Sequence, residues 1–105
     1  MKYSKGYFKK TQKLIKGVAI ESIGKSTSLG EVRRIAKLAE MKIKYVKYLS
    51  KEYALMIKKN KGNKSAKNLK LPVINEAIDS ILKSSSSREM ERDVDLAVSK
   101  LRFFI

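Results

Sequence analysis

The 105-residue chain contains no cysteine, no histidine and no tryptophan. Without cysteine it cannot build a disulfide framework or a thiolate metal site. Without histidine it lacks the side chain that most often serves as a general base and as a zinc ligand. We therefore expect no metal site, no cofactor and no catalytic residues, and we interpret the chain as a binding protein rather than an enzyme.

Long apolar runs are also missing. No stretch approaches the ~20 consecutive apolar residues that span a bilayer, and the first residues lack the apolar core of a signal peptide. We therefore expect no membrane partner and a cytoplasmic location. Hydrophobic residues still make up 43% of the chain, which is enough for the core of one small domain over residues 1–105.

Acidic residues are scarce, and they are unevenly distributed. Residues 1–70 contain twenty lysines or arginines and four acidic residues, whereas residues 71–105 contain five and six. The formal net charge of +15 repels itself in a compact fold, and a polyanionic partner would neutralise it. Nucleic acid is the commonest such partner, and an anionic membrane surface is the next.

Apolar residues recur at three- and four-residue steps along the chain, which is the period of an amphipathic helix. No segment alternates with period two over the length of a strand. The pattern predicts an all-α fold, a compact bundle of four to five helices with one long central helix.

Capping signals predict where the first two helices begin and end. We expect the first helix over residues 4–23, ended by Gly24 in a left-handed conformation. Ser28 and Glu31 have the spacing of a capping box, in which the serine hydroxyl accepts from the backbone N–H of the third helical residue. The long second helix is then expected to run from residue 29 to about residue 59.

The second half of the chain has its own signals for where helices begin and end. The second helix would be ~45 Å long, so a bend or break near residues 41–45 is left open. Residues 60–68 contain turn formers and lysines without an apolar period, and we expect a loop there. Pro72 suits the first position of the next helix. Ser86 and Glu89 form a second capping box before the last helix.

Each expected helix has an apolar stripe that would face the core. The stripe of the first helix comprises Phe8, Thr11, Ile15, Val18 and Ala19. The stripe of the second comprises Ile35, Leu38, Ala39, Val46, Leu49, Tyr53, Met56 and Ile57. The stripes of the last two helices comprise Val73, Ile74, Ala77, Ile78, Ile81 and Leu82, and then Met90, Val94, Ala97, Val98, Leu101 and Phe104.

One side of the second helix carries a row of basic residues. At ~100° per residue they fall within a sector of ~80°, roughly 150° from the apolar stripe, and Glu40 alone interrupts them. The row covers ~37 Å of helix, a length over which nucleic-acid phosphates offer matching charge. The row, called the basic row below, comprises Arg33, Lys37, Lys44, Lys47, Lys51 and Lys58.

The basic row favours binding to the backbone phosphates of a nucleic acid, with Arg34 as a further contact. A merely solvated face, the alternative, would mix glutamates with lysines in i,i+4 pairs. Further positive charge comes from the lysines of the first helix and of the expected loop, which are Lys5, Lys9, Lys13, Lys16, Lys61, Lys64 and Lys67.

Two other residue patterns have a functional and a structural interpretation. Tyr45 and Tyr48 flank the basic row, where they could stack on bases, but packing at the rim of the core is the favoured interpretation. Among the acidic residues of the last helix, Glu89 and Asp93 form one i,i+4 pair and Glu91 and Asp95 form another. These pairs could share a metal ion, but acids in the first turns of a helix stabilise its dipole, and we favour that role.

The order of these segments resembles the small all-helical subunit of type III-A CRISPR effector complexes. That family has a Thr/Ser-rich turn, here Ser26-Thr27-Ser28, and a helix start with Ser-Gln-(Ile/Leu)-Arg, here Gly30-Glu31-Val32-Arg33. Its Ala-Tyr segment ending in a basic residue is similar to residues 53–58. Its final acidic and aromatic helix is similar to residues 93–98 followed by residues 102–104.

The resemblance implies a non-catalytic RNA-binding subunit of an antiviral ribonucleoprotein complex. Copies of the subunit would contact the phosphates of guide RNA paired with target RNA, beside the other subunits of the complex, and self-association is left open. Arg33 matches the arginine of the family, whereas Gly30 and Glu31 depart from its serine and glutamine.

Other classes of protein remain as alternatives. A free-standing helical DNA-binding or chromatin protein would also use a basic surface, and the sequence leaves the choice between RNA and DNA open. A helical protein of the membrane surface would have apolar faces rich in tryptophan and phenylalanine, whereas these faces are built from isoleucine, valine, alanine and leucine.

Overall fold

The structure is a computed structural model that describes the backbone of residues 5–59 and 64–103 and the side chains of residues 6–59 and 72–103. These residues form four α-helices and no strand. The helices are α1 (Lys5–Lys25), α2 (Leu29–Lys59), α3 (Lys64–Lys83) and α4 (Ser87–Arg102). The prediction of an all-α bundle with one long central helix is confirmed.

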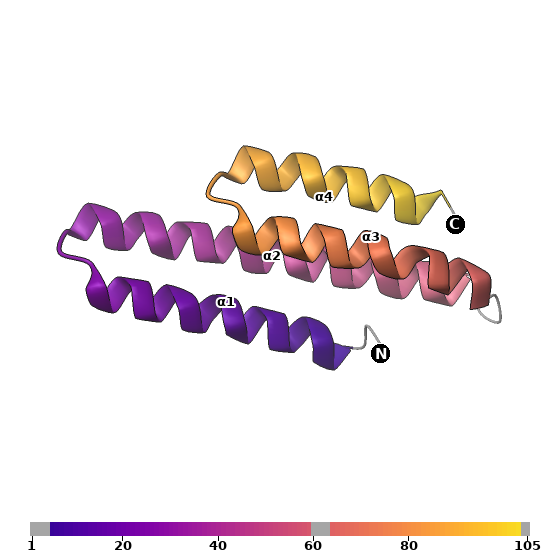
Figure 1. Ribbon diagram of the computed structural model, residues 1–105, viewed down its shortest axis with the longest axis horizontal. Helices are drawn as coiled ribbons and strands as arrows, with labels where there is room; N and C mark the ends of the chain where they lie inside the picture. Colours follow the sequence, from indigo (N-terminus) through magenta and orange to yellow (C-terminus); the bar gives the residue numbers. More distant parts are fainter. Residues whose placement is uncertain (1–4, 60–63, 104–105) are drawn as a thin grey trace.

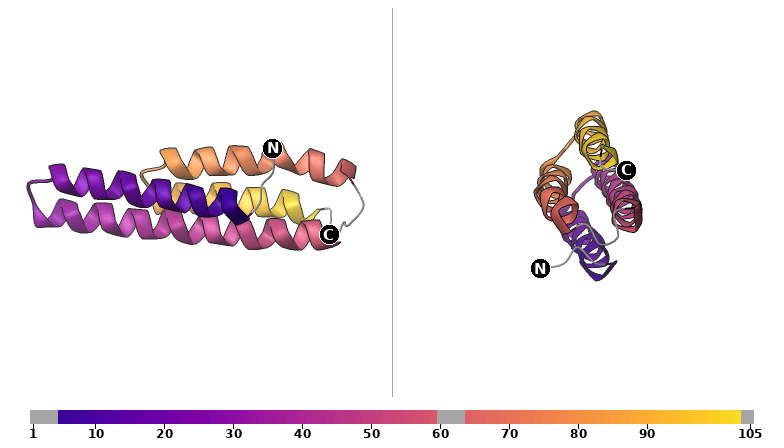
Figure 2. Two further views of the ribbon diagram at one scale, coloured as in Figure 1. Left: turned by 90° about the horizontal axis from the view of Figure 1, so that it is seen from below. Right: turned by 90° about the vertical axis from the view of Figure 1, so that its right-hand side faces the viewer.

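Helix α2 is the centre of the bundle. Helix α1 runs antiparallel to it, α3 returns along its C-terminal half, and α4 runs beside α3 in the direction of α2 (Figure 1). Helices α1, α3 and α4 all pack against α2, and α3 also packs against α4. The end view in Figure 2 shows the four helices gathered around a common interior.

The α1–α2 hairpin is longer than the α3–α4 hairpin. Its closed end therefore extends beyond the connection between α3 and α4 (Figure 1), and the molecule measures 52 × 25 × 16 Å. We call this end, residues 14–41, the overhang. In most of the overhang, α1 and α2 pack against each other without the two C-terminal helices, whereas at its inner edge Ile15 is buried in the core.

The core lies where all four helices meet. The largest fully buried side chains come from α2, α3 and α4, and they are Val46, Leu49, Met56, Ile74, Ile81, Met90, Val94 and Leu101. Helix α1 adds Phe8 and Ile15, and the ring of Phe8 lies 6.1 Å from the ring of Tyr53. These residues belong to the predicted stripes, because helical periodicity determines which side of each helix is apolar.

Three apolar members of the predicted stripes, Val18, Ala19 and Ile35, do not join the core. Val18 is 56% exposed, because it lies in the overhang, where neither α3 nor α4 covers that side of α1. Phe104 lies outside the described residues.

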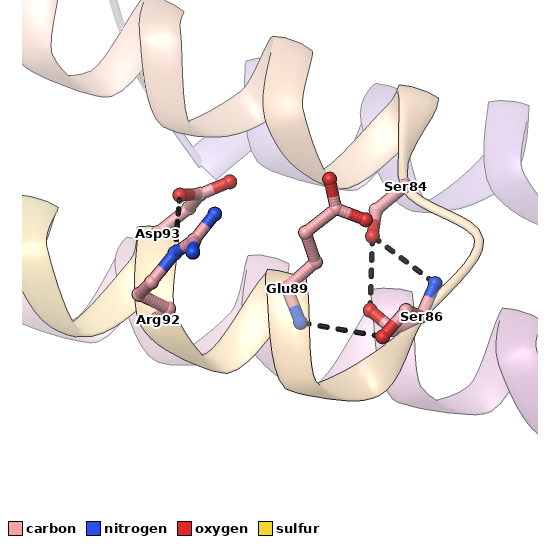
Figure 3. A network of polar contacts seen from close by, with 5 residues as sticks. All are labelled: Ser84, Ser86, Glu89, Arg92 and Asp93. Carbon is pink, nitrogen blue, oxygen red and sulfur yellow. Dashed lines mark hydrogen bonds and ion pairs between the residues drawn. The ribbon is translucent and has the colours of Figure 1, made fainter.

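Serine residues begin α2 and α4, as predicted. The hydroxyl of Ser28 accepts a hydrogen bond from the backbone N–H of Glu31 at 3.2 Å. The hydroxyl of Ser86 accepts from the N–H of Glu89 at 3.4 Å (Figure 3). The hydroxyl of Ser84 also donates to the carbonyl of Ser86 at 2.9 Å and accepts from its N–H at 3.3 Å, so the connection between α3 and α4 is tightly held.

The predicted end of α1 is wrong. The helix continues through Gly24 to Lys25, and Gly24 does not adopt a positive φ. Ser26 ends the helix instead, because its backbone N–H donates to the carbonyl of Ile23 at 3.1 Å and its hydroxyl donates to the carbonyl of Ser22 at 3.0 Å. These bonds satisfy carbonyls that a left-handed glycine cap would otherwise serve.

The predicted loop at residues 60–68 is also partly wrong. Helix α3 begins at Lys64, so Pro72 lies inside the helix rather than at its first position. Residues 64–71 contain no glycine and no proline. Their lysines, alanine and leucines are good helix formers. Pro72 removes one backbone donor from α3.

Helix α2 runs through residues 41–45 without interruption, so no break divides it. Lys42 is the one cation on its apolar side, and its ammonium donates to the backbone carbonyl of Leu82 at 3.0 Å. This bond ties the middle of α2 to the last turn of α3.

Candidate nucleic-acid interface

The basic row lies on the outer side of α2. All six of its residues are exposed, and the uninterrupted helix keeps them aligned over ~37 Å. The apolar stripe of α2 faces α3 and α4, so the basic row points away from both. A rigid ridge of regularly spaced cations is suited to contact with a phosphate backbone.

Arg34 is exposed but does not lie with the basic row. It is turned by ~100° from Arg33, and it lines a groove between α1 and α2 together with Glu31 and Lys42. Arg34, which we expected as a further phosphate contact, is therefore separated from Arg33 by the turn of the helix.

No described acidic side chain forms an ion pair with the basic row. Among the described residues, ion pairs join Lys25 to Glu21, Arg92 to Asp93 and Arg102 to Glu52, and none involves the row. Of the three acidic residues in α2, Glu31 lines the groove and Glu52 forms an ion pair with Arg102. Glu40 alone remains beside the row.

A shallow hollow lies in the middle of the basic row. Its volume is about 500 Å³, and it is lined by Glu40, Ile43, Lys44, Lys47, Tyr48 and Lys51. Three ammonium groups therefore border one open depression on a rigid helix. Lysine binds phosphate as a compact point charge, so the hollow is the part of the row best arranged to receive a phosphate group.

Helix α1 extends the basic surface. Lys9, Lys13 and Lys16 are exposed, and on the helix they lie ~150° from Leu14 and Val18, which line the groove. The lysines and the groove are therefore on opposite sides of the hairpin. We call the basic row and these three lysines together the basic face. The side chains of Lys5, Lys61, Lys64 and Lys67 lie outside the described residues.

The tyrosines beside the basic row are packed against the core. Tyr45 and Tyr48 are half-buried and contact core residues. Burial raises the pKa of the Tyr45 hydroxyl, and the nearby carboxylates of Glu91 and Asp95 raise it further. This environment agrees with rim packing, with the hydroxyl groups near the surface.

The acidic residues of α4 do not gather into a metal site. In the part of the chain that the structure describes, no three acidic side chains come close enough to hold a metal ion. Asp93 instead forms an ion pair with Arg92, with Nε of the arginine 3.8 Å from Oδ1 of the aspartate (Figure 3). Glu89 lies in the first turn of α4, where a carboxylate stabilises the helix dipole.

Sequence reasoning missed the contact between Glu52 and Arg102. The glutamate is buried, and Nε of Arg102 lies 2.8 Å from its Oε1. The position of Glu52 at the edge of the apolar stripe is a signal that it needs a cation nearby. Periodicity alone does not say which of the 25 lysines and arginines supplies it.

Comparisons of the chain with protein-family models, with curated proteins and with solved structures found no match. Within the described residues, no helix combines the length and apolarity that crossing a membrane requires. The fold and the site describe a four-helix bundle with a row of exposed cations along its central helix. The resemblance to a CRISPR effector subunit stays a prediction.

Proposed function

We propose that this chain binds RNA through its backbone phosphates, using the basic face. The observation that carries the proposal is the alignment of six exposed cations, none with an ion-pair partner among the described residues, on one uninterrupted helix. Contacts of this kind hold a nucleic acid without reading its sequence. Specificity would then come from base pairing with a guide RNA.

The protein complex that best suits this activity is a CRISPR effector of the type III-A class, in which the chain would be a non-catalytic small subunit. The proposal is supported by the order of the sequence segments that resemble that family. It is also supported by the position of Arg33, which matches the family's arginine and begins the basic row. The partners would be guide and target RNA and the other subunits of the complex.

The second candidate is a free-standing DNA-binding or chromatin protein. Its basis is that a ~37 Å row of cations can follow the phosphates of a DNA duplex as well as those of RNA. A helix-turn-helix places a short recognition helix after a tight turn, whereas here the exposed cations lie on the long central helix. The RNA proposal is therefore preferred, and the affinities for RNA and DNA of equal length decide between the two.

The proposal is tested by reversing charge at the hollow. The variant Lys44→Glu, Lys47→Glu, Lys51→Glu should lose RNA binding, while each change alters the free energy of unfolding by less than ~0.5 kcal/mol because the side chains face water. The matched control is Lys83→Glu, Arg88→Glu, Arg92→Glu, which makes the same change in net charge on α3 and α4. Equal loss in both variants would mean that total charge, rather than the basic row, governs binding.

A second experiment tests the place of the chain in a complex. When the chain is expressed with its genomic neighbours and a guide RNA, we expect it to co-purify in more than one copy, with copy number rising with the length of paired RNA. Arg33→Glu should lower that number, and Arg92→Glu should not. One copy regardless of RNA length would reject the small-subunit proposal and leave the RNA-binding proposal standing.

A further inference from the structure

The overhang leaves one side of the α1–α2 hairpin uncovered. Along the C-terminal half of α2, that side is covered by α3 and α4 (Figures 1 and 2). Beyond the end of α3, a groove of about 460 Å³ lies between α1 and α2 and reaches Leu82 in the last turns of α3. The groove therefore continues the bundle interior past the point where the covering helices end.

The lining of the groove is largely apolar and has helical spacing on both of its walls. Helix α2 contributes Ile35, Leu38 and Ala39, and α1 contributes Leu14, Ile15, Val18 and Ala19. Leu14 is 54% exposed and Val18 is 56% exposed. Positions at three- and four-residue steps on two adjacent helices form the kind of surface against which a third helix packs. The groove extends along residues 31–42 of α2, which is ~17 Å of helix and matches about 11 residues of a bound helix.

The polar residues of the groove are two cations, one acid and Ser22, so its rim carries a net positive charge. Glu31, Arg34 and Lys42 line it, and Lys42 is half-buried at its inner end. The ammonium of Lys42 donates to the carbonyl of Leu82 and forms no ion pair with any described residue. Burial lowers the pKa of Lys42, because a desolvated ammonium lacks a nearby anion. A carboxylate entering the groove would supply that anion.

The apolar lining and the positive charge of the groove indicate which kind of molecule binds there. RNA does not suit an apolar lining. A second copy would bring another net charge of +15 and the same cations. An acidic helix of another protein matches both the apolar lining and the positive rim.

We propose that the groove binds an acidic amphipathic α-helix of a partner protein. Apolar side chains at i, i+3 or i+4, and i+7 of that helix would fill the groove between α1 and α2, and its flanking carboxylates would face Arg34 and Lys42. The groove lies ~170° around α2 from the basic row. The chain can therefore bind a protein on one side and RNA on the other, and this proposal does not depend on the RNA proposal.

A synthetic peptide of about 16 residues tests the proposal on the full chain. The probe carries leucines on one helical face and glutamates on both flanks, and the control peptide has the same composition in scrambled order. We expect the probe to bind at least about tenfold more tightly than the scrambled peptide. Leu14→Gln combined with Val18→Gln should weaken the probe about tenfold, because apolar area is lost from the groove. The control Leu96→Gln, at a residue on α4 that is also 56% exposed, should have no effect.

Charge complementarity has its own variant. Arg34→Gln should weaken the glutamate-flanked probe and leave a glutamine-flanked version of it unchanged. Equal binding of probe and scrambled peptide would overturn the proposal, and so would probe binding that survives Leu14→Gln with Val18→Gln. Concentration-dependent dimerisation of the chain alone, abolished by the same two substitutions, would assign the groove to a second copy and also overturn it. The variant Leu14→Gln with Val18→Gln should bind RNA with the same affinity as the unsubstituted chain.

Discussion

The guanidinium of Arg102 holds the carboxylate of Glu52 through two hydrogen bonds, Nε to Oε1 at 2.8 Å and Nη2 to Oε2 at 3.3 Å. This contact ties the end of α4 to the C-terminal half of α2, and the Glu52 side chain is only 9% exposed. Hydrogen bonding and the charge of Glu52 raise the pKa of Arg102. The pair also removes from solvent the acidic residue next to Lys51, which keeps the basic row positive.

The ion pair between Arg102 and Glu52 should contribute to the stability of the fold. Arg102→Met leaves a buried carboxylate without its cation, and an uncompensated buried charge is destabilising. We expect a lower urea midpoint for Arg102→Met than for Arg88→Met, which changes an exposed arginine at the start of α4. Equal urea midpoints for the two variants would show that water solvates the Glu52 carboxylate without a loss of stability.

The serine cap of α4 should make a measurable contribution to the free energy of unfolding. Ser86→Ala removes the acceptor for the Glu89 N–H, and loss of such a cap costs about 1 kcal/mol of stability. Ser85→Ala is the control, because Ser85 lies in the same connection and does not cap the helix. Urea unfolding of the two variants compares them directly. A loss of the same size in both would contradict the role of Ser86.

Alkaline pH should reveal the environment of Tyr45. Because the folded chain raises the pKa of this hydroxyl above its ordinary value of 10.0, the unfolded chain loses the proton first. The stability contributed by neutral Tyr45 is therefore present below that value and lost as the pH rises through the folded pKa. Tyr45→Phe should make the alkaline fall in unfolding free energy less steep. Lys42, whose buried ammonium acts in the opposite direction, is present in both proteins and cancels in the comparison. An unchanged fall would contradict this environment.

The parts of the fold that local sequence determines were predictable. Ser28 and Ser86 cap helices because a hydroxyl before an apolar period satisfies backbone donors a few residues away. Leu49 and Met90 are buried because the helical period gives each helix one apolar side. The exposure of the basic row follows from the same period, and it needed no knowledge of the tertiary structure.

The parts that depend on how far the helices overlap could not be predicted. Val18 belongs to a good apolar stripe, and its exposure follows only from the shortness of the α3–α4 hairpin. The groove arises for the same reason. The pairing of Glu52 with Arg102 joins residues 50 positions apart. Gly24 was assigned a left-handed cap from its residue type alone, whereas Ser26 makes the bonds that end α1.

The salt dependence of RNA affinity tests the central claim most directly. If the six cations of the basic row contact phosphates, the slope of log affinity against log salt should be about −4 for single-stranded RNA and about −5 for a duplex. The neutral variant Lys44→Gln, Lys47→Gln, Lys51→Gln should make the single-strand slope shallower by about 2. An affinity that is independent of salt, or a slope that these three substitutions leave unchanged, would contradict binding through the basic row.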